Sequence, residues 1–195
     1  MILNQQNTAN VDLTGAEDFA ARLRQVLALG DRDFNICFVD DLQIRKLNTT
    51  YRGQACPTDV LSFRWSTSEA PDERGPNREF AGFLGDVVIS VETARRNAEA
   101  EGHTASTEIS WLILHGLLHL LGMDHETDHG EMAALELGLR ARLGMEGQTQ
   151  PSNPPRAAGR KSRVAGFARS KRGLKRGNRR RPAPKPTSGS TAGRH

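Results

Sequence analysis

The segment His115-Gly116-Leu117-Leu118-His119-Leu120-Leu121-Gly122-Met123-Asp124-His125 carries three histidines within an otherwise largely apolar run. Residues four apart lie on one face of a helix, with Cβ atoms about 6 Å apart, so His115 and His119 can reach one ion from adjacent turns. Gly122 lets the chain turn sharply, because glycine tolerates a positive φ, and the turn can bring His125 to the same ion. Three imidazoles and an open fourth position are typical of a catalytic zinc site. We therefore expect these three histidines to hold one Zn²⁺ per chain.

This spacing is similar to the zinc-peptidase pattern H-E-x-x-H-x-x-G-x-x-H, but Gly116 stands where that pattern has its general-base glutamate. A peptidase of this type needs the carboxylate to deprotonate the metal-bound water, so the sequence disfavours peptide hydrolysis by that route. Other acidic residues could supply a carboxylate, namely Asp59, Asp124, Glu126 and Asp128. His129 is a candidate fourth ligand, which would instead make the site closed and structural.

Outward from this segment, hydrophobic spacing and capping residues predict an α+β fold. We expect a small mixed β-sheet of about four strands packed with about five helices, around a zincin-like three-histidine site. The expected strands are 34–39, 60–65, 85–91 and one more if the N-terminal segment contributes. The expected helices run from a Thr14–Glu17 capping box to Gly30, from an Asp40 cap through Leu47, over 92–101, from a Thr104 cap to 121, and over 127–143. Residues 48–58 and 66–80 read as loops.

The charge is divided unevenly along the chain. Residues 151–195 hold 14 Lys or Arg and no Asp or Glu, so the first 150 residues carry 13 basic against 23 acidic residues. The tail is also poor in hydrophobic residues and cannot bury enough apolar surface to fold. We therefore predict a catalytic domain over 1–146 and a disordered basic tail over 147–195.

The tail contains a dense basic run that predicts an anionic partner, RNA above all. Its members are Lys171, Arg172, Lys175, Arg176, Arg179, Arg180 and Arg181. No signal peptide or spanning segment is recognisable, so a cytoplasmic protein without a membrane partner is expected. Cys37 reads as a small buried hydrophobe, and Cys56 as a loop thiol that could in principle bind metal.

The histidine segment resembles the signature of the bacterial YbeY family. Two further segments agree with this resemblance: Leu47-Asn48-Thr49-Thr50-Tyr51-Arg52 followed by Pro57-Thr58-Asp59-Val60-Leu61-Ser62-Phe63, and Leu84-Gly85-Asp86-Val87-Val88-Ile89-Ser90. The similarity covers roughly residues 10–145. Met123 departs from it, since an aromatic is common there, and the basic extension is not a general family feature.

The resemblance implies a zinc-dependent, single-strand-directed endoribonuclease that matures the 3′ end of small-subunit (16S) rRNA and takes part in ribosome quality control. It implies single-stranded RNA, rRNA and the ribosome or small-subunit proteins as partners, without DNA specificity. It also implies that Arg52 lies near the metal, where an arginine fork can bind a phosphate and stabilise its developing charge.

Two other readings of the site stay open: a metallohydrolase of another substrate class, and a non-catalytic zinc-containing assembly or RNA-binding factor. Asp59 and Asp86 are expected to cap or orient backbone, although either could fix a histidine tautomer.

Overall fold

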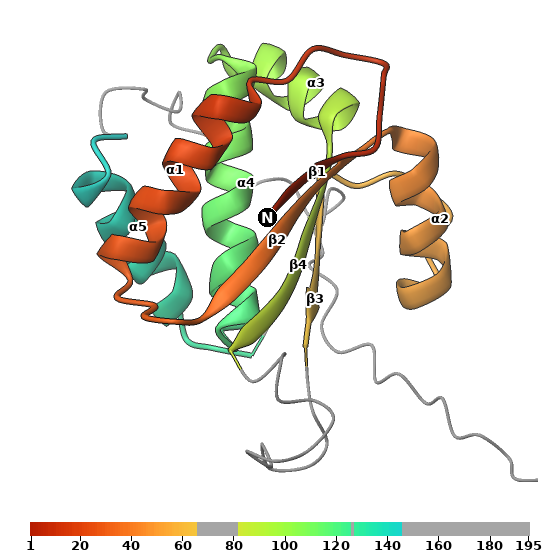
Figure 1. Ribbon diagram of the computed structural model, residues 1–195. Helices are drawn as coiled ribbons and strands as arrows, with labels where there is room; N and C mark the ends of the chain where they lie inside the picture. Colours follow the sequence, from red (N-terminus) through yellow and green to blue (C-terminus); the bar gives the residue numbers. More distant parts are fainter. Residues whose placement is uncertain (66–81, 126, 146–195) are drawn as a thin grey trace, which may run out of the picture.

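Four strands and five helices form the described part of the chain, residues 1–65, 82–125 and 127–145, in the computed structural model (Figure 1). In chain order they are β1 (Ile2–Asn4), α1 (Leu13–Val26), β2 (Asp33–Val39), α2 (Asp41–Arg52), β3 (Val60–Arg64), β4 (Phe83–Ser90), α3 (Val91–Glu101), α4 (Ala105–Leu120) and α5 (Glu131–Arg142). The expected α+β class is therefore confirmed. The expected loop 66–80 and the basic tail 147–195 lie outside the described residues, so the domain boundary near 146 stays a prediction.

The strands form one mixed sheet in the order β1-β2-β4-β3. β1 pairs with β2 and β2 with β4 in parallel, whereas β3 pairs antiparallel with β4. In this last pair Val60 lies opposite Ile89, and Arg64 opposite Gly85. The edge strand β3 therefore ends at the same end of the sheet at which β4 begins, which is also the end reached by the C-terminal half of α4 (Figure 1).

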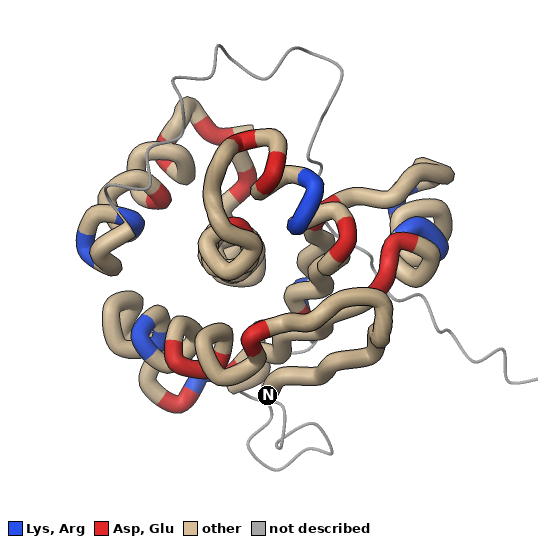
Figure 2. Tube along the Cα trace, turned by 90° about the horizontal axis from the view of Figure 1, so that it is seen from above, with Lys and Arg blue, Asp and Glu red and all other residues tan. Residues whose placement is uncertain are grey.

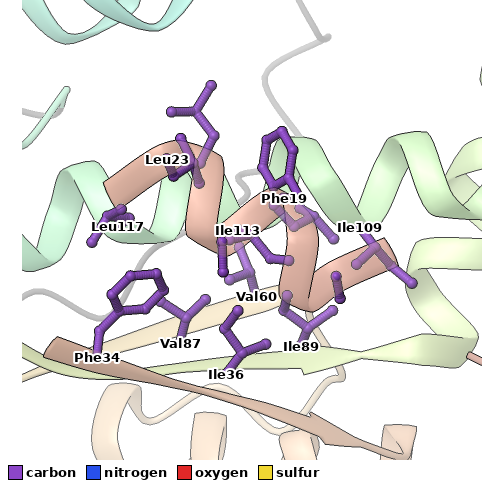
Figure 3. Packing of buried hydrophobic residues seen from close by; sticks show 14 of the residues in the cluster. Phe19, Leu23, Phe34, Ile36, Val60, Val87, Ile89, Ile109, Ile113 and Leu117 are labelled. Carbon is purple, nitrogen blue, oxygen red and sulfur yellow. The ribbon is translucent and has the colours of Figure 1, made fainter. Parts of the chain in front are cut away.

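The main core lies between the sheet and helices α1, α3, α4 and α5. Successive strand residues point to opposite faces, so alternate residues of β2 and β4 enter this core. Figure 3 shows Phe34, Ile36, Val87 and Ile89 facing the apolar side chains of α1 and α4. Helix α4 is buried on most of its surface, because it lies between the sheet and the helices α1, α3 and α5 that pack around it.

Helix α2 covers the opposite face of the sheet by itself (Figure 1). A smaller cluster of Val39, Ile44, Leu61 and Val88 joins it to the strands. Half-buried Cys37 packs against this cluster and not in the main core, so its expected burial is only partly realised, and Cys56 is exposed.

Several predicted helix ends are wrong. Helix α1 begins after Asp12, whose side chain accepts a hydrogen bond from the Gly15 amide, so the Thr14–Glu17 capping box does not form. It ends at Val26 and not at Gly30, and a positive-φ turn at Ala28 follows it. The last helix starts at Glu131 and not at 127. Asp40 does cap α2, in a full capping box with Gln43.

Charged residues of the described part are spread over several elements, with Asp and Glu (red) on most helices and Lys and Arg (blue) scattered between them (Figure 2). Thus the positive charge of the whole sequence belongs largely to residues 151–195. In the described residues, none of the helices combines the length and the apolar character that crossing a membrane would require.

Candidate metal centre

The three histidines of the first-quoted segment come together at the C-terminal end of α4. His115 and His119 lie one turn apart on α4, which ends at Leu120. Gly122 then adopts φ +98°, a left-handed conformation that L side chains rarely adopt, and this turn returns the chain so that His125 faces the other two rings. The local turn that the sequence predicted therefore forms.

The spacing of the imidazoles suits one shared ion. Nε2 of His119 lies 3.2 Å from Nε2 of His115, and one ligand nitrogen from each of the three rings lies within 4.8 Å of the others. Two nitrogens bound tetrahedrally to one zinc at 2.0–2.1 Å would lie about 3.4 Å apart. His115 and His119 are partly buried and His125 is exposed, so the site opens to solvent on the His125 side.

The protonation state of the centre also suits a cation. Burial is the main cause that lowers the pKa of His119 to about 4, and the neighbouring His115 and His125 add to the shift. The imidazole is therefore neutral at pH 7, and its Nε2 lone pair is available to a ligand.

A carboxylate that the sequence reading missed orients one of the three rings. Nδ1 of His115 lies 3.1 Å from Oε2 of Glu136 on α5, so Nδ1 donates the hydrogen bond and Nε2 is left as the acceptor. Burial by itself would raise the pKa of Glu136, but His115 and Arg140 outweigh it and hold this pKa below its usual value. Glu136 is thus an anion at neutral pH, the form that fixes the tautomer and strengthens His115 as a ligand.

A signal for Glu136 was present in the sequence. The buried stripe of α5 and the residues after it consists of Met132, Leu139 and Leu143. Glu136 lies on the same stripe by helical spacing, and a charged residue there needs a buried partner. Helical spacing alone does not say which residue of another element Glu136 meets.

Gly116 has a structural reason to be glycine. A Cβ atom at this position would lie 2.6 Å from Cγ1 of Val87 and 3.0 Å from Oγ of Ser62. The Ser62 hydroxyl donates a 3.0 Å hydrogen bond to the Gly116 carbonyl, so a side chain of β3 contacts the backbone of α4 here. Position 116 therefore faces the sheet, and a general-base carboxylate has no room there.

A second missed residue is Arg64, the last residue of β3. A Cβ atom built at Gly122 would lie 2.9 Å from Nη1 of Arg64, so the guanidinium covers the turn between His119 and His125. Arg64 is exposed. Nothing in the spacing of the sequence signals this contact, because it joins a strand end to a turn 58 residues later.

Arg52 lies in the last turn of α2, immediately before the C-cap Gly53, and not in a loop as expected. Its side chain is half-buried. Helices α2 and α4 run in the same sense on opposite faces of the sheet, with β3 at the edge between them (Figure 1). The end of α2 that carries Arg52 thus points to the end of the sheet at which the histidines lie.

The remaining carboxylates have structural contacts. Asp59 accepts hydrogen bonds from the Val60 amide and Asn97, and Asp86 accepts one from Asn35 on β2, as the structural interpretation of both residues predicted. Asp128 accepts hydrogen bonds from the Gly130 and Met132 amides at the start of α5. Exposed His129 is not part of the three-histidine group, and Glu126 lies outside the described residues.

The comparison with protein families gives a match over residues 1–144 to the model described as Endoribonuclease YbeY. The chain belongs to the YbeY family. The match covers every described helix and strand, and so the whole three-histidine site lies within the family domain.

Curated relatives agree with the family assignment. The chain is 44% identical over 117 residues to Endoribonuclease YbeY of Nautilia profundicola, which covers 60% of this chain and 76% of that protein. It is 39% identical over 146 residues to Endoribonuclease YbeY of Sulfurovum sp., covering 73% and 90% of the two chains. The solution structure of TM1509 from Thermotoga maritima matches with a TM-score of 0.50 at 22% identity, over 79% of this chain and all of that one. This last likeness shows the fold alone.

Proposed function

We propose that this chain is a divalent-metal-dependent endoribonuclease that cuts single-stranded RNA, with His115, His119 and His125 as the ligands of one zinc ion. The observation that carries the proposal is the convergence of three imidazoles at a solvent-open turn, in a chain whose family is named for endoribonuclease activity. When bound, zinc would supply a Lewis acid and an activated water for phosphodiester hydrolysis.

Two arginines are proposed to bind the phosphate of the substrate. Arg64 lies over the Gly122 turn, and Arg52 lies at the end of α2 that points towards the same end of the sheet. A guanidinium offers paired donors that match phosphate oxygens, and it stabilises negative charge that develops on them. Arg52 is the residue that the family resemblance implied, whereas Arg64 is added by the geometry.

Peptide hydrolysis is the weaker alternative. Peptidases of similar histidine spacing use a glutamate at the position of Gly116, and here Val87 and Ser62 occupy the space that its side chain would need. A closed structural zinc site is also disfavoured, because among the described residues no fourth histidine, cysteine or carboxylate joins the three-histidine group.

The proposed biological setting is the maturation of the 3′ end of small-subunit rRNA and ribosome quality control in the cytoplasm. Residues 147–195 would then form a basic tail that raises the affinity for rRNA without taking part in the chemistry. The family name supports an RNA substrate, and the 14 basic residues beyond Gln150 support an anionic partner.

The test is cleavage of a labelled RNA that carries a single-stranded 3′ extension. The full chain loaded with zinc is expected to cleave it, and chelated protein and the His119→Ala variant are expected to be inactive. His129→Ala is the matched control, because His129 is an exposed histidine that follows His125 by four residues but lies outside the group. Cleavage that survives both chelation and His119→Ala would refute the proposal.

A further inference from the structure

A second cluster of potential ligands lies at the opposite end of α4 from the three histidines. It consists of Glu101 at the end of α3, His103 in the connection, and Glu108 in the first turn of α4. One ligand atom from each of these residues lies within 4.8 Å of the other two. In Figure 2 the start of α4 faces the viewer, with acidic residues (red) beside it.

The cluster is buried, unlike an ordinary group of surface acids. The side chains of His103, Glu101 and Glu108 are 5%, 14% and 3% exposed. Two carboxylates buried so closely together stay ionised only beside a compensating cation.

The tautomer of His103 points to what that cation is. Nδ1 of His103 lies 3.2 Å from the Thr104 carbonyl oxygen, which can only accept, so Nδ1 carries a proton. Nε2 is buried and has no hydrogen-bond partner in the described part of the chain. A doubly protonated ring would direct an Nε2–H bond at one of the carboxylates, but Glu101 at 3.6 Å is beyond hydrogen-bond reach and Glu108 at 3.3 Å makes no hydrogen bond with this nitrogen.

The distances within the cluster fit ligands of a common ion. Nε2 of His103 lies 3.3 Å from Oε2 of Glu108 and 3.6 Å from Oε2 of Glu101. Nitrogen and oxygen ligands at 2.0–2.2 Å from a tetrahedral zinc lie about 3.4 Å apart, between these two values. An imidazole with two carboxylates is a donor set that suits zinc and similar divalent transition ions.

We propose that Glu101, His103 and Glu108 form a second, structural site for a divalent transition ion, with zinc as the first candidate. The ion would tie the end of α3 to the first turn of α4, and so fix the start of the helix that carries His115 and His119. The chain would then bind two ions and not the single one expected from the sequence. This inference does not depend on the RNA cleavage proposed above.

A line of contacts leads from this second site to the first. The His103 ring lies edge-on to Trp111, with centroids 4.4 Å apart, and the Arg140 guanidinium lies 4.7 Å from the centre of the Trp111 ring. Arg140 in turn pairs with Glu136, the carboxylate that orients His115. Loss of the second ion is therefore expected to loosen the packing around the first.

The decisive experiment counts ions in the metal-free full chain after dialysis against zinc chloride alone. Two zinc ions are expected in the unaltered chain and in the control His129→Gln, and one in His103→Gln. One is also expected in the double variant His115→Ala/His119→Ala, and X-ray absorption of that remaining ion should show a single imidazole with oxygen ligands.

If His103→Gln fails to fold, Glu101→Gln takes its place in the ion count, since Glu101 is the most exposed ligand and its replacement keeps the side-chain shape. Far-UV circular dichroism verifies the fold of each variant. A count of one zinc in the unaltered chain, two in folded His103→Gln, or a second ion bound only at millimolar zinc would overturn the proposal. In the first case His103 would be a buried imidazolium paired with the two glutamates.

Discussion

The Oε2 atom of Glu136 lies 3.1 Å from Nδ1 of His115 and fixes which ring nitrogen faces the other two histidines. We predict that Glu136→Gln lowers the zinc affinity of the three-histidine site by about 10- to 100-fold, because an amide supports the ring less strongly than an anion does. Competition with a zinc indicator measures this affinity. Glu99→Gln, an exposed change on α3, should have no effect; equal affinities of the Glu136 and Glu99 variants would contradict the assigned role.

The contact between α4 and the sheet at Gly116 should tolerate no added methyl group. Gly116→Ala is expected to lower the free energy of unfolding by about 1–3 kcal/mol, because its Cβ would overlap Val87. Denaturant titration measures this loss. Gly138→Ala on α5 is a matched control with open space around it, and should be neutral or stabilising by up to about 1 kcal/mol. A Gly116→Ala variant as stable as the unaltered chain would show that β3 and α4 can separate at this point.

The Arg64 side chain should affect RNA cleavage and not zinc binding. We expect Arg64→Ala to lower RNA cleavage at least tenfold while the zinc content stays unchanged, because the guanidinium lies over the turn and is not a metal ligand. Arg45→Ala, an exposed change on α2, is the control. If Arg64→Ala loses zinc together with activity, its role is to hold the Gly122 turn in place.

The attachment of α2 should depend on pH through Asp41. Burial alone would raise the pKa of Asp41, but hydrogen bonds from Ser90, Thr93 and Arg96 hold this pKa below its usual value. The unfolded chain therefore takes up a proton at a higher pH than the folded chain, and the stabilisation by Asp41 is complete above about pH 5 and lost as the pH falls through the folded pKa.

Asp41→Asn should accordingly lower the free energy of unfolding by about 1–3 kcal/mol at pH 7, and by less as the pH falls below 4. Denaturant titrations at a series of pH values measure this difference. Asp18→Asn, an exposed change on α1, is the control. A difference for Asp41→Asn that is the same at pH 3 and pH 7 would show that this carboxylate does not titrate as described.

Removal of residues 147–195 should weaken RNA binding at low salt and leave cleavage chemistry intact. Each phosphate contact that is lost reduces the slope of log affinity against log salt by about 0.7 for single strands. Fluorescence anisotropy with a labelled RNA at several salt concentrations measures this slope. The same slope with and without these residues would show that residues 147–195 do not contact the RNA.

The sequence predicted most of the fold and the centre of the candidate site. The strand over 34–39 and the helix over 92–101 were predictable because a buried apolar run and helical periodicity are local signals, and the histidine spacing encodes its own geometry on α4. The errors lie at the ends of helices and strands, since β4 spans Phe83–Ser90 and not 85–91. Asp12 and not Thr14 caps α1. Helix α2 continues through Arg52 to Gly53, where a positive φ ends it.

Contacts between distant segments were not predictable in the same way. Glu136 meets His115 from 21 residues away, and Arg64 meets Gly122 only because β3 is the edge strand next to α4. Hydrophobic periodicity says which face of an element is buried, but not which element covers it. The cluster of Glu101, His103 and Glu108 was missed for another reason, since its members are near in sequence but belong to two helices whose angle no local pattern gives.

The core is divided unequally between the two faces of the sheet, and this division affects which helix opens locally to solvent. Within the described residues, a cluster of four buried side chains, of which Ile44 belongs to α2, joins α2 to its face of the sheet, whereas the main core of 23 buried residues holds α4. Amide protons of α2 should therefore exchange with solvent through local opening, well before those of α4. Arg52 would then lie on a helix that opens locally, and the histidines on one that does not. RNA bound to both would hold α2 against the sheet and slow the exchange of the α2 amide protons.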